Sequence, residues 1–140
     1  MKKFDIDRFI ADATDAIHGP TPQLAIQDAL ARAVSEPDAL TLALPVERAE
    51  IVPLHTSDTL SVLKVVWAPG MAFRPHNHLM WAAIGLYAGQ EDNTFYERSA
   101  GALVSAGGRE LRTGDVAVLG ANAIHSLRNP RQTLTAPIHL

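Results

Sequence analysis

Hydrophobic positions recur with a helical period in the first part of the chain. Apolar side chains in residues 9–17 are spaced for one helix face, and Asp5 precedes them where an acidic residue caps a helix N-terminus. The pair Thr21-Pro22 is typical of a second helix start, and residues 26–34 repeat the apolar stripe. We therefore predict a helical segment over residues 1–45.

From about residue 50 the period of the hydrophobic pattern drops to two, which is the alternation of a β-strand. Short antiparallel strands in a small domain close on themselves to hide their edges, as a barrel or jelly roll does. The pattern predicts an all-β domain over residues 46–140, with the helices packed outside. The expected strands, roughly eight in number, are 51–54, 60–67, 80–87, 94–97, 102–104, 116–119, 124–127 and 134–140.

Two further structural predictions depend on local residues. Gly107-Gly108 is predicted to be a hairpin turn rather than a phosphate-binding loop, because no helix follows it. Glu91 lies within the turn signal over residues 89–93, so we expect a solvated carboxylate there.

The composition fits a single globular domain, because 47% of the 140 residues are apolar and 19% are charged. With 12 Lys and Arg against 15 Asp and Glu, the net charge is −3, and no basic cluster favours nucleic acid as a partner. No apolar run approaches the roughly 18 residues of a membrane span. Since the start of the chain is acidic after Lys2-Lys3, unlike a signal peptide, we expect a soluble cytoplasmic protein.

Candidate chemistry concentrates in the histidines. Cysteine is absent, which excludes disulfides, thiolate ligands and a cysteine nucleophile. In the run His76-Asn77-His78 the two imidazoles would project from one face of a strand, as two metal ligands must. The apolar residues 79–84 follow, which favours an inward-facing pair, and buried imidazoles without a metal would need several hydrogen-bond partners. The pattern therefore predicts a metal site.

The spacing around these histidines resembles the two cupin motifs. Gly70, five residues, His76, one residue and His78, with Gly89 downstream, is similar to the first motif, G-x5-H-x-H-x3/4-E-x6-G. The second motif, G-x5-P-x-G-x2-H-x3-N, is matched at Gly114, His125 and Asn129 but not at its Pro and second Gly positions. The resemblance covers about residues 50–140. It implies a cupin double-stranded β-helix, and it implies that His125 joins the other two histidines on one metal.

One departure from the first motif indicates which group of cupins the sequence resembles. Ala82 stands at the position of the motif glutamate, so the expected site has three imidazoles and no carboxylate. In this respect the sequence resembles the thiol dioxygenases, and the runs 76–85 and 91–96 resemble a bacterial group of cysteine-dioxygenase-like metal enzymes. This resemblance implies a mononuclear Fe(II) centre that oxidises a small thiol to a sulfinate with O2. Three neutral ligands leave the full metal charge to attract a thiolate.

The substrate-binding residues of cysteine dioxygenases are only partly matched. Those enzymes hold the substrate carboxylate with an early-strand arginine, which residues 54–58 lack. Arg74 is the nearest substitute, the alternative being an exposed arginine with no such role. His139 matches the histidine of their late Ser-His-Tyr relay, but Pro137 replaces the serine and no tyrosine follows. Arg74 and His139 are therefore the candidate catalytic residues.

Two other functions remain open at this point. A three-histidine cupin site also suits Zn, Ni or Mn as a Lewis acid in an isomerase or hydrolase. A non-catalytic cupin that binds a small ligand or a metal is the other alternative. The final strand, 134–140, is shorter than a jelly roll requires, so either this family member is truncated or a second copy completes the sheet edge, and the second alternative favours a homodimer.

Overall fold

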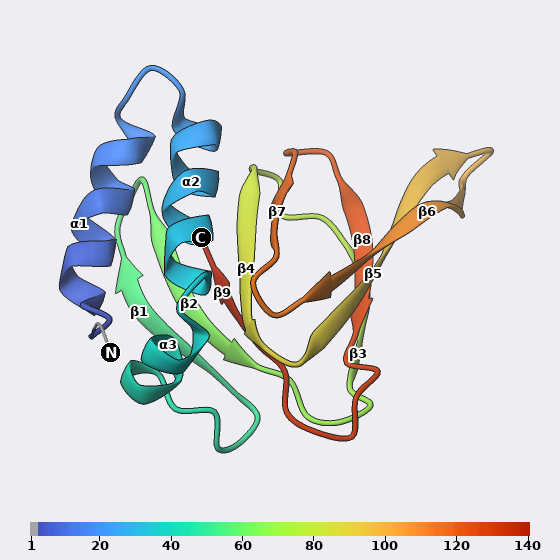
Figure 1. The fold of residues 1–140 in the computed structure, drawn as a ribbon. Helices are drawn as coiled ribbons and strands as arrows, with labels where there is room; N and C mark the ends of the chain where they lie inside the picture. Colours follow the sequence, from blue (N-terminus) through green and yellow to red (C-terminus); the bar gives the residue numbers. More distant parts are fainter. Residues whose placement is uncertain (1–2) are drawn as a thin grey trace.

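Three helices cover one face of a two-sheet body in the computed structural model, which describes residues 3–140 (Figure 1). The first two residues of the predicted helical segment lie outside this range. None of the described helices is long and apolar enough to cross a membrane. The helices are α1 (Ile6–Ile17), α2 (Pro22–Val34) and α3 (Pro37–Ala43).

The described residues form two antiparallel sheets that face each other. One sheet has the strand order β1-β2-β9-β4-β7, and the other has the order β3-β8-β5-β6. The strands are β1 (Glu50–Thr56), β2 (Ser61–Val66), β3 (Ala72–His76), β4 (Ala82–Ala88), β5 (Gln90–Ser99), β6 (Ala102–Arg112), β7 (Val116–Leu119), β8 (Ile124–Arg128) and β9 (Ala136–His139).

The helices pack on the outside of the five-stranded sheet. Asp5 caps α1 by accepting a hydrogen bond from the backbone N–H of Arg8 at 3.0 Å. The stripe of α2 is buried as its spacing predicted, and it lies directly over β4. Gly85 makes this close packing possible, since a Cβ at that position would lie 2.9 Å from Cγ1 of Val34. A continuous apolar core therefore joins the helical layer to the sheet.

Side chains of β4 alternate between this outer core and the interior of the two-sheet body. Ala83 and Tyr87 are buried among the helix side chains, and the hydroxyl of Tyr87 donates to the carbonyl of Leu44 at 2.9 Å. Ile84 and Leu86 belong to a second cluster between the two sheets. By this alternation Ala82 faces the interior.

One local prediction is wrong, and one strand was not predicted. Gly107-Gly108 lies within β6, and the hairpin turn from β5 falls instead at Ala100 and Gly101, whose φ angles are 49° and 81°. Residues 72–76 were not predicted as a strand, yet they form β3, an edge strand with mostly exposed side chains.

The final strand is not at an edge of the sheet. β9 pairs with β2 on one side and with β4 on the other. The expectation that it leaves an edge for a second copy is therefore wrong, and the homodimer stays a prediction without that argument.

Candidate metal centre

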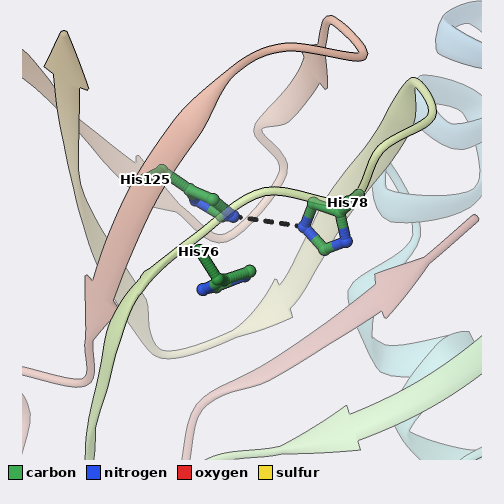
Figure 2. Close-up of side chains that lie close together, drawn as sticks. All are labelled: His76, His78 and His125. Carbon is green, nitrogen blue, oxygen red and sulfur yellow. Dashed lines mark hydrogen bonds between the residues drawn. The ribbon is translucent and has the colours of Figure 1, made fainter. Parts of the chain in front are cut away.

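Three predicted ligands come together although they are distant in sequence (Figure 2). His76 is the last residue of β3 and is paired in register with His125 on β8. His78 lies beyond the strand end, in the loop before β4, so the alternation argument does not place it. The loop nevertheless brings it beside the others, and one nitrogen of each ring lies within 4.8 Å of the other two. Their assignment as metal ligands stays a prediction.

Hydrogen bonds at Nδ1 direct the Nε2 atoms of two rings toward this cluster. Nδ1 of His125 donates to Oδ1 of Asn93 at 2.8 Å, and Nδ1 of His76 donates to the carbonyl of Arg74 at 2.9 Å. Because these oxygens only accept, the lone pair of each imidazole is on Nε2. Nε2 of His78 lies 3.2 Å from Nε2 of His125. A cation between these nitrogens would satisfy them together, so the donor set fits a bound metal.

Burial favours the neutral, metal-ligating form of two of these imidazoles, those of His78 and His125. Burial lowers the pKa of His125 to about 4, with smaller contributions from the neighbouring His76 and His78. Burial also lowers the pKa of His78, again with a contribution from His76. The ring of Phe95 stacks on that of His125, with the two planes 19° apart. The surroundings of His78 and His125 therefore disfavour protonation of these two rings.

Behind His125 lies a buried polar chain that sequence reasoning missed. Asn93 is 5% exposed, and its Nδ2 donates to Oε1 of Glu91 at 3.3 Å. Glu91 has no exposed surface, so the expectation of a solvated carboxylate is wrong. Burial raises its pKa to about 7, because the charged form loses its hydration. Both residues lie on β5, which begins at Gln90 and leaves no exposed turn over residues 90–93.

The two candidate catalytic residues differ in their positions. His139 lies on β9 opposite Ile84, and its Nε2 is buried without a hydrogen-bond partner among the described residues. Burial lowers its pKa to about 3, with smaller contributions from His78 and His125. Arg74 is instead exposed on β3, and its carbonyl accepts a hydrogen bond from Nδ1 of His76. The structure thus brings His139 to the cluster but not the guanidinium of Arg74.

A cavity of about 520 Å³ borders the cluster. His78 and His139 line one part of it, and Trp81 and Ala82 lie beside them. Other lining residues come from the loop between α1 and α2 and from the turn between β1 and β2. The helical layer therefore contributes to the wall of a cavity that reaches the histidines.

Comparison with solved structures identifies the architecture. The chain resembles the cupin domain of Cnp3 from Schizosaccharomyces pombe, with a TM-score of 0.57 and 11% identity over 69% of this chain and 63% of that domain. It also resembles a cupin family protein with a double-stranded β-helix fold from Methanocaldococcus jannaschii, with a TM-score of 0.57 and 9% identity over 69% and 81%. The chain has a cupin fold.

The cupin fold confirms the all-β prediction with helices outside the barrel. A cupin superfamily protein from Desulfitobacterium hafniense is similar as well, with a TM-score of 0.53 and 16% identity over 72% of this chain and 86% of that one. At these identities the likeness concerns the fold alone. Neither a protein-family model nor a curated protein matches the sequence.

Within this cupin fold, the position of the motif glutamate is occupied by a buried alanine. Ala82 is 6% exposed and lines the same cavity as His78. No carboxylate belongs to the three-histidine cluster in the part of the chain that the structure describes. The candidate centre therefore offers three neutral nitrogen ligands.

Proposed function

We propose that this cupin is a metal-dependent oxidoreductase that oxidises a small thiol to a sulfinate with O2 at a mononuclear iron site. The observation that carries the proposal is the donor set: three imidazoles, no carboxylate, and a cavity alongside. The reaction is RSH + O2 → RSO2⁻ + H⁺, in which sulfur gives up four electrons and both oxygen atoms enter the product. No other oxidant or reductant is required.

The charge of the ligand set favours an anionic substrate. His76, His78 and His125 would hold the ion through neutral nitrogens, so the centre would keep a net charge of +2. Iron(II) bound there would supply open coordination positions for sulfur and dioxygen. Low pKa values of His78 and His125 keep these ligands available at neutral pH.

His139 would orient the thiol beside the three ligands. Its ring borders the cavity, and its Nε2 has no hydrogen-bond partner within residues 3–140. Its pKa of about 3 keeps the ring neutral. A neutral ring can exchange a hydrogen bond with the substrate without adding a positive charge that competes with the metal.

The test is stoichiometric oxidation by metal-loaded protein. The chain is loaded anaerobically with Fe(II), Zn(II), Ni(II) or Mn(II) and exposed to O2 with several thiols, and O2 uptake and sulfinate are measured together. We expect one sulfinate per O2 with Fe(II) alone, and no product from His125→Ala under the same conditions. Tight metal binding without oxidation of any thiol would contradict the proposal and favour a cupin of other chemistry.

A further inference from the structure

The cavity beside the histidines has the volume of a small-molecule site. At about 520 Å³ it lies within the common range of roughly 300–1,000 Å³. His78 and His139 mark the part nearest the candidate metal centre. Ser57, Asp58 and Thr59, in the turn between β1 and β2, mark another part. A ligand that reaches the metal through this cavity would therefore extend toward that turn.

Its walls are mostly apolar and come from both the helices and the barrel. Ile17 and Ile26 contribute from α1 and α2, while Leu60 and Leu63 contribute from the end of the β1–β2 turn and from β2. Leu60 and Ile26 are buried, so these walls belong to the packed core. Such walls favour an alkyl chain and disfavour any charge without a partner.

In the part of the chain that the structure describes, the lining of the cavity has a negatively charged side chain but no lysine or arginine. Asp58 has the only acidic side chain among the described lining residues, and neither lysine nor arginine lines the cavity. The remaining titratable side chains there are histidines, His18, His78 and His139. Arg74 lies outside the lining, with its side chain exposed on β3. A carboxylate that extends from the metal toward the β1–β2 turn would meet neither lysine nor arginine and would face Asp58.

We propose that the cavity binds the end of the substrate opposite the thiol, and that the substrate is a small thiol without a carboxylate. This inference rests on the proposed function. The alkyl part lies between the helical layer and the barrel, and an ammonium group at its end faces Asp58. At the end opposite the thiol, the carboxylate of a mercapto acid would lose hydration without gaining a lysine or arginine as a partner.

Binding is measured apart from oxidation by titrating Zn(II)-loaded protein calorimetrically. The probes 2-aminoethanethiol, 1-propanethiol and 3-mercaptopropionate share the HS–CH2–CH2 unit and differ in their terminal group. We expect the aminothiol to bind most tightly, the alkyl thiol to bind next, and the acid to bind at least tenfold more weakly than the aminothiol.

Three variants test which residue recognises the terminal group of the thiol. Asp58→Lys, at an exposed turn, should reverse the order of the aminothiol and the acid. Asp38→Lys makes the same change of charge at an exposed residue outside the cavity and should leave the order unchanged. Arg74→Ala should also have no effect.

Tightest binding of the mercapto acid, or loss of that binding in Arg74→Ala, would overturn the proposal. So would an order that Asp58→Lys leaves unchanged. Oxidation with the opposite preference would refute this inference and leave the proposed function intact. Binding in the expected order without oxidation by the iron form would support this inference and contradict the proposed function.

Discussion

At the scale of single residues, the orientation of His125 depends on one amide. Asn93 accepts the Nδ1 proton of the imidazole at 2.8 Å, which directs the Nε2 lone pair toward the other two histidines. Asn93→Ala should therefore weaken metal binding by about 10- to 100-fold, the usual effect of losing such a partner. The measurement is the dissociation constant for Zn(II) or Fe(II) by competition with a chelator.

The control for this variant lies on the same strand as His125. Ser126 shares a hydrogen bond with the hydroxyl of Tyr96 at 2.8 Å and is next to His125 in sequence. Ser126→Ala removes a polar contact without touching the imidazole, so its metal affinity should equal that of the wild type. Equal losses in Asn93→Ala and Ser126→Ala would show that the effect is general packing.

Glu91 gives the metal-free protein a distinctive pH dependence. Its pKa is raised from an ordinary value of 4.5 to about 7, so between these values the unfolded chain has released a proton that the folded chain retains. The lowered pKa values of His125 and His139 make the free energy of unfolding rise with pH in this range, and Glu91 opposes that rise by contributing a decrease. In Glu91→Gln this contribution should be absent, as measured by urea denaturation from pH 4 to 8. An identical pH profile for both proteins would contradict the assignment.

At the scale of elements, β4 separates two environments by its alternation. Ala82 lines the cavity beside His78, whereas Ala83 is buried against the helices. Ala82→Glu should add an anionic ligand, so metal should bind as tightly or more tightly while thiol oxidation falls sharply. Ala83→Glu places the same carboxylate in the apolar core and should reduce stability without tightening the metal. If both variants bound metal alike, the register of β4 at the centre would be wrong.

The buried side chain of Asn129 stabilises the connection between β8 and β9 through hydrogen bonds. Nδ2 of Asn129 lies within hydrogen-bond distance of the carbonyls of Trp67, Ala68 and Thr133, and its Oδ1 accepts from the backbone N–H of Arg131. Asn129→Ala would remove the side-chain partner of the Thr133 carbonyl and of the Arg131 N–H, whereas the carbonyls of Trp67 and Ala68 would keep hydrogen bonds from the backbone N–H groups of Thr135 and Met71. The free energy of unfolding should fall by about 2–4 kcal/mol, measured by chemical denaturation.

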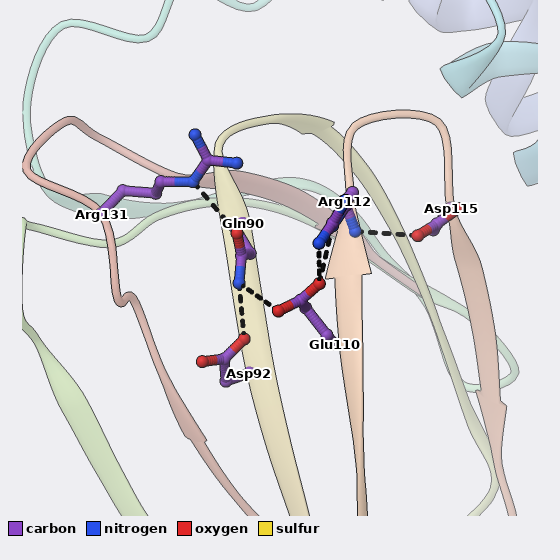
Figure 3. A network of polar contacts seen from close by, with 6 residues as sticks. All are labelled: Gln90, Asp92, Glu110, Arg112, Asp115 and Arg131. Atoms are coloured by element: carbon purple, nitrogen blue, oxygen red, sulfur yellow. Dashed lines mark hydrogen bonds and ion pairs between the residues drawn. The ribbon is translucent and has the colours of Figure 1, made fainter.

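A surface network on the same connection provides the contrast (Figure 3). Arg131 donates to Oε1 of Gln90, whose amide donates in turn to Asp92 and Glu110. Exposed polar contacts of this kind contribute little, so Arg131→Ala should cost less than about 1 kcal/mol. If Arg131→Ala lowered the free energy of unfolding as much as Asn129→Ala does, the prediction that the buried hydrogen bonds contribute more than the exposed ones would be contradicted.

The elements also show where sequence patterns stop being informative. The stripe of α2 and the run of β7 were predictable, because burial on one helix face or in a sheet interior leaves a regular apolar pattern. β6 was predicted only in part. Its side chains are almost all exposed, so they form no regular apolar pattern, and the pair Gly107-Gly108 is typical of a turn. Periodicity reports burial, so it misses strands that are exposed on both faces.

At the scale of the whole molecule, the sequence motifs predicted which histidines meet, although their spacing alone does not explain it. His78 reaches the cluster through a loop conformation, which includes Leu79 at a φ of 59°. The burial of Glu91 and the cavity wall supplied by the helices arise from contacts between distant segments. Such contacts leave no local pattern in the chain, so the second layer around the site was not predictable.

The central claim is that His76, His78 and His125 together hold one metal ion. The most direct measurement is metal content by mass spectrometry for untagged wild type, the three single alanine variants and His55→Ala, a half-buried histidine outside the cluster. We predict about one ion per chain in the wild type and in His55→Ala, and loss of stoichiometric metal in each variant of the cluster. Full retention of metal by any one of those three variants would contradict the account.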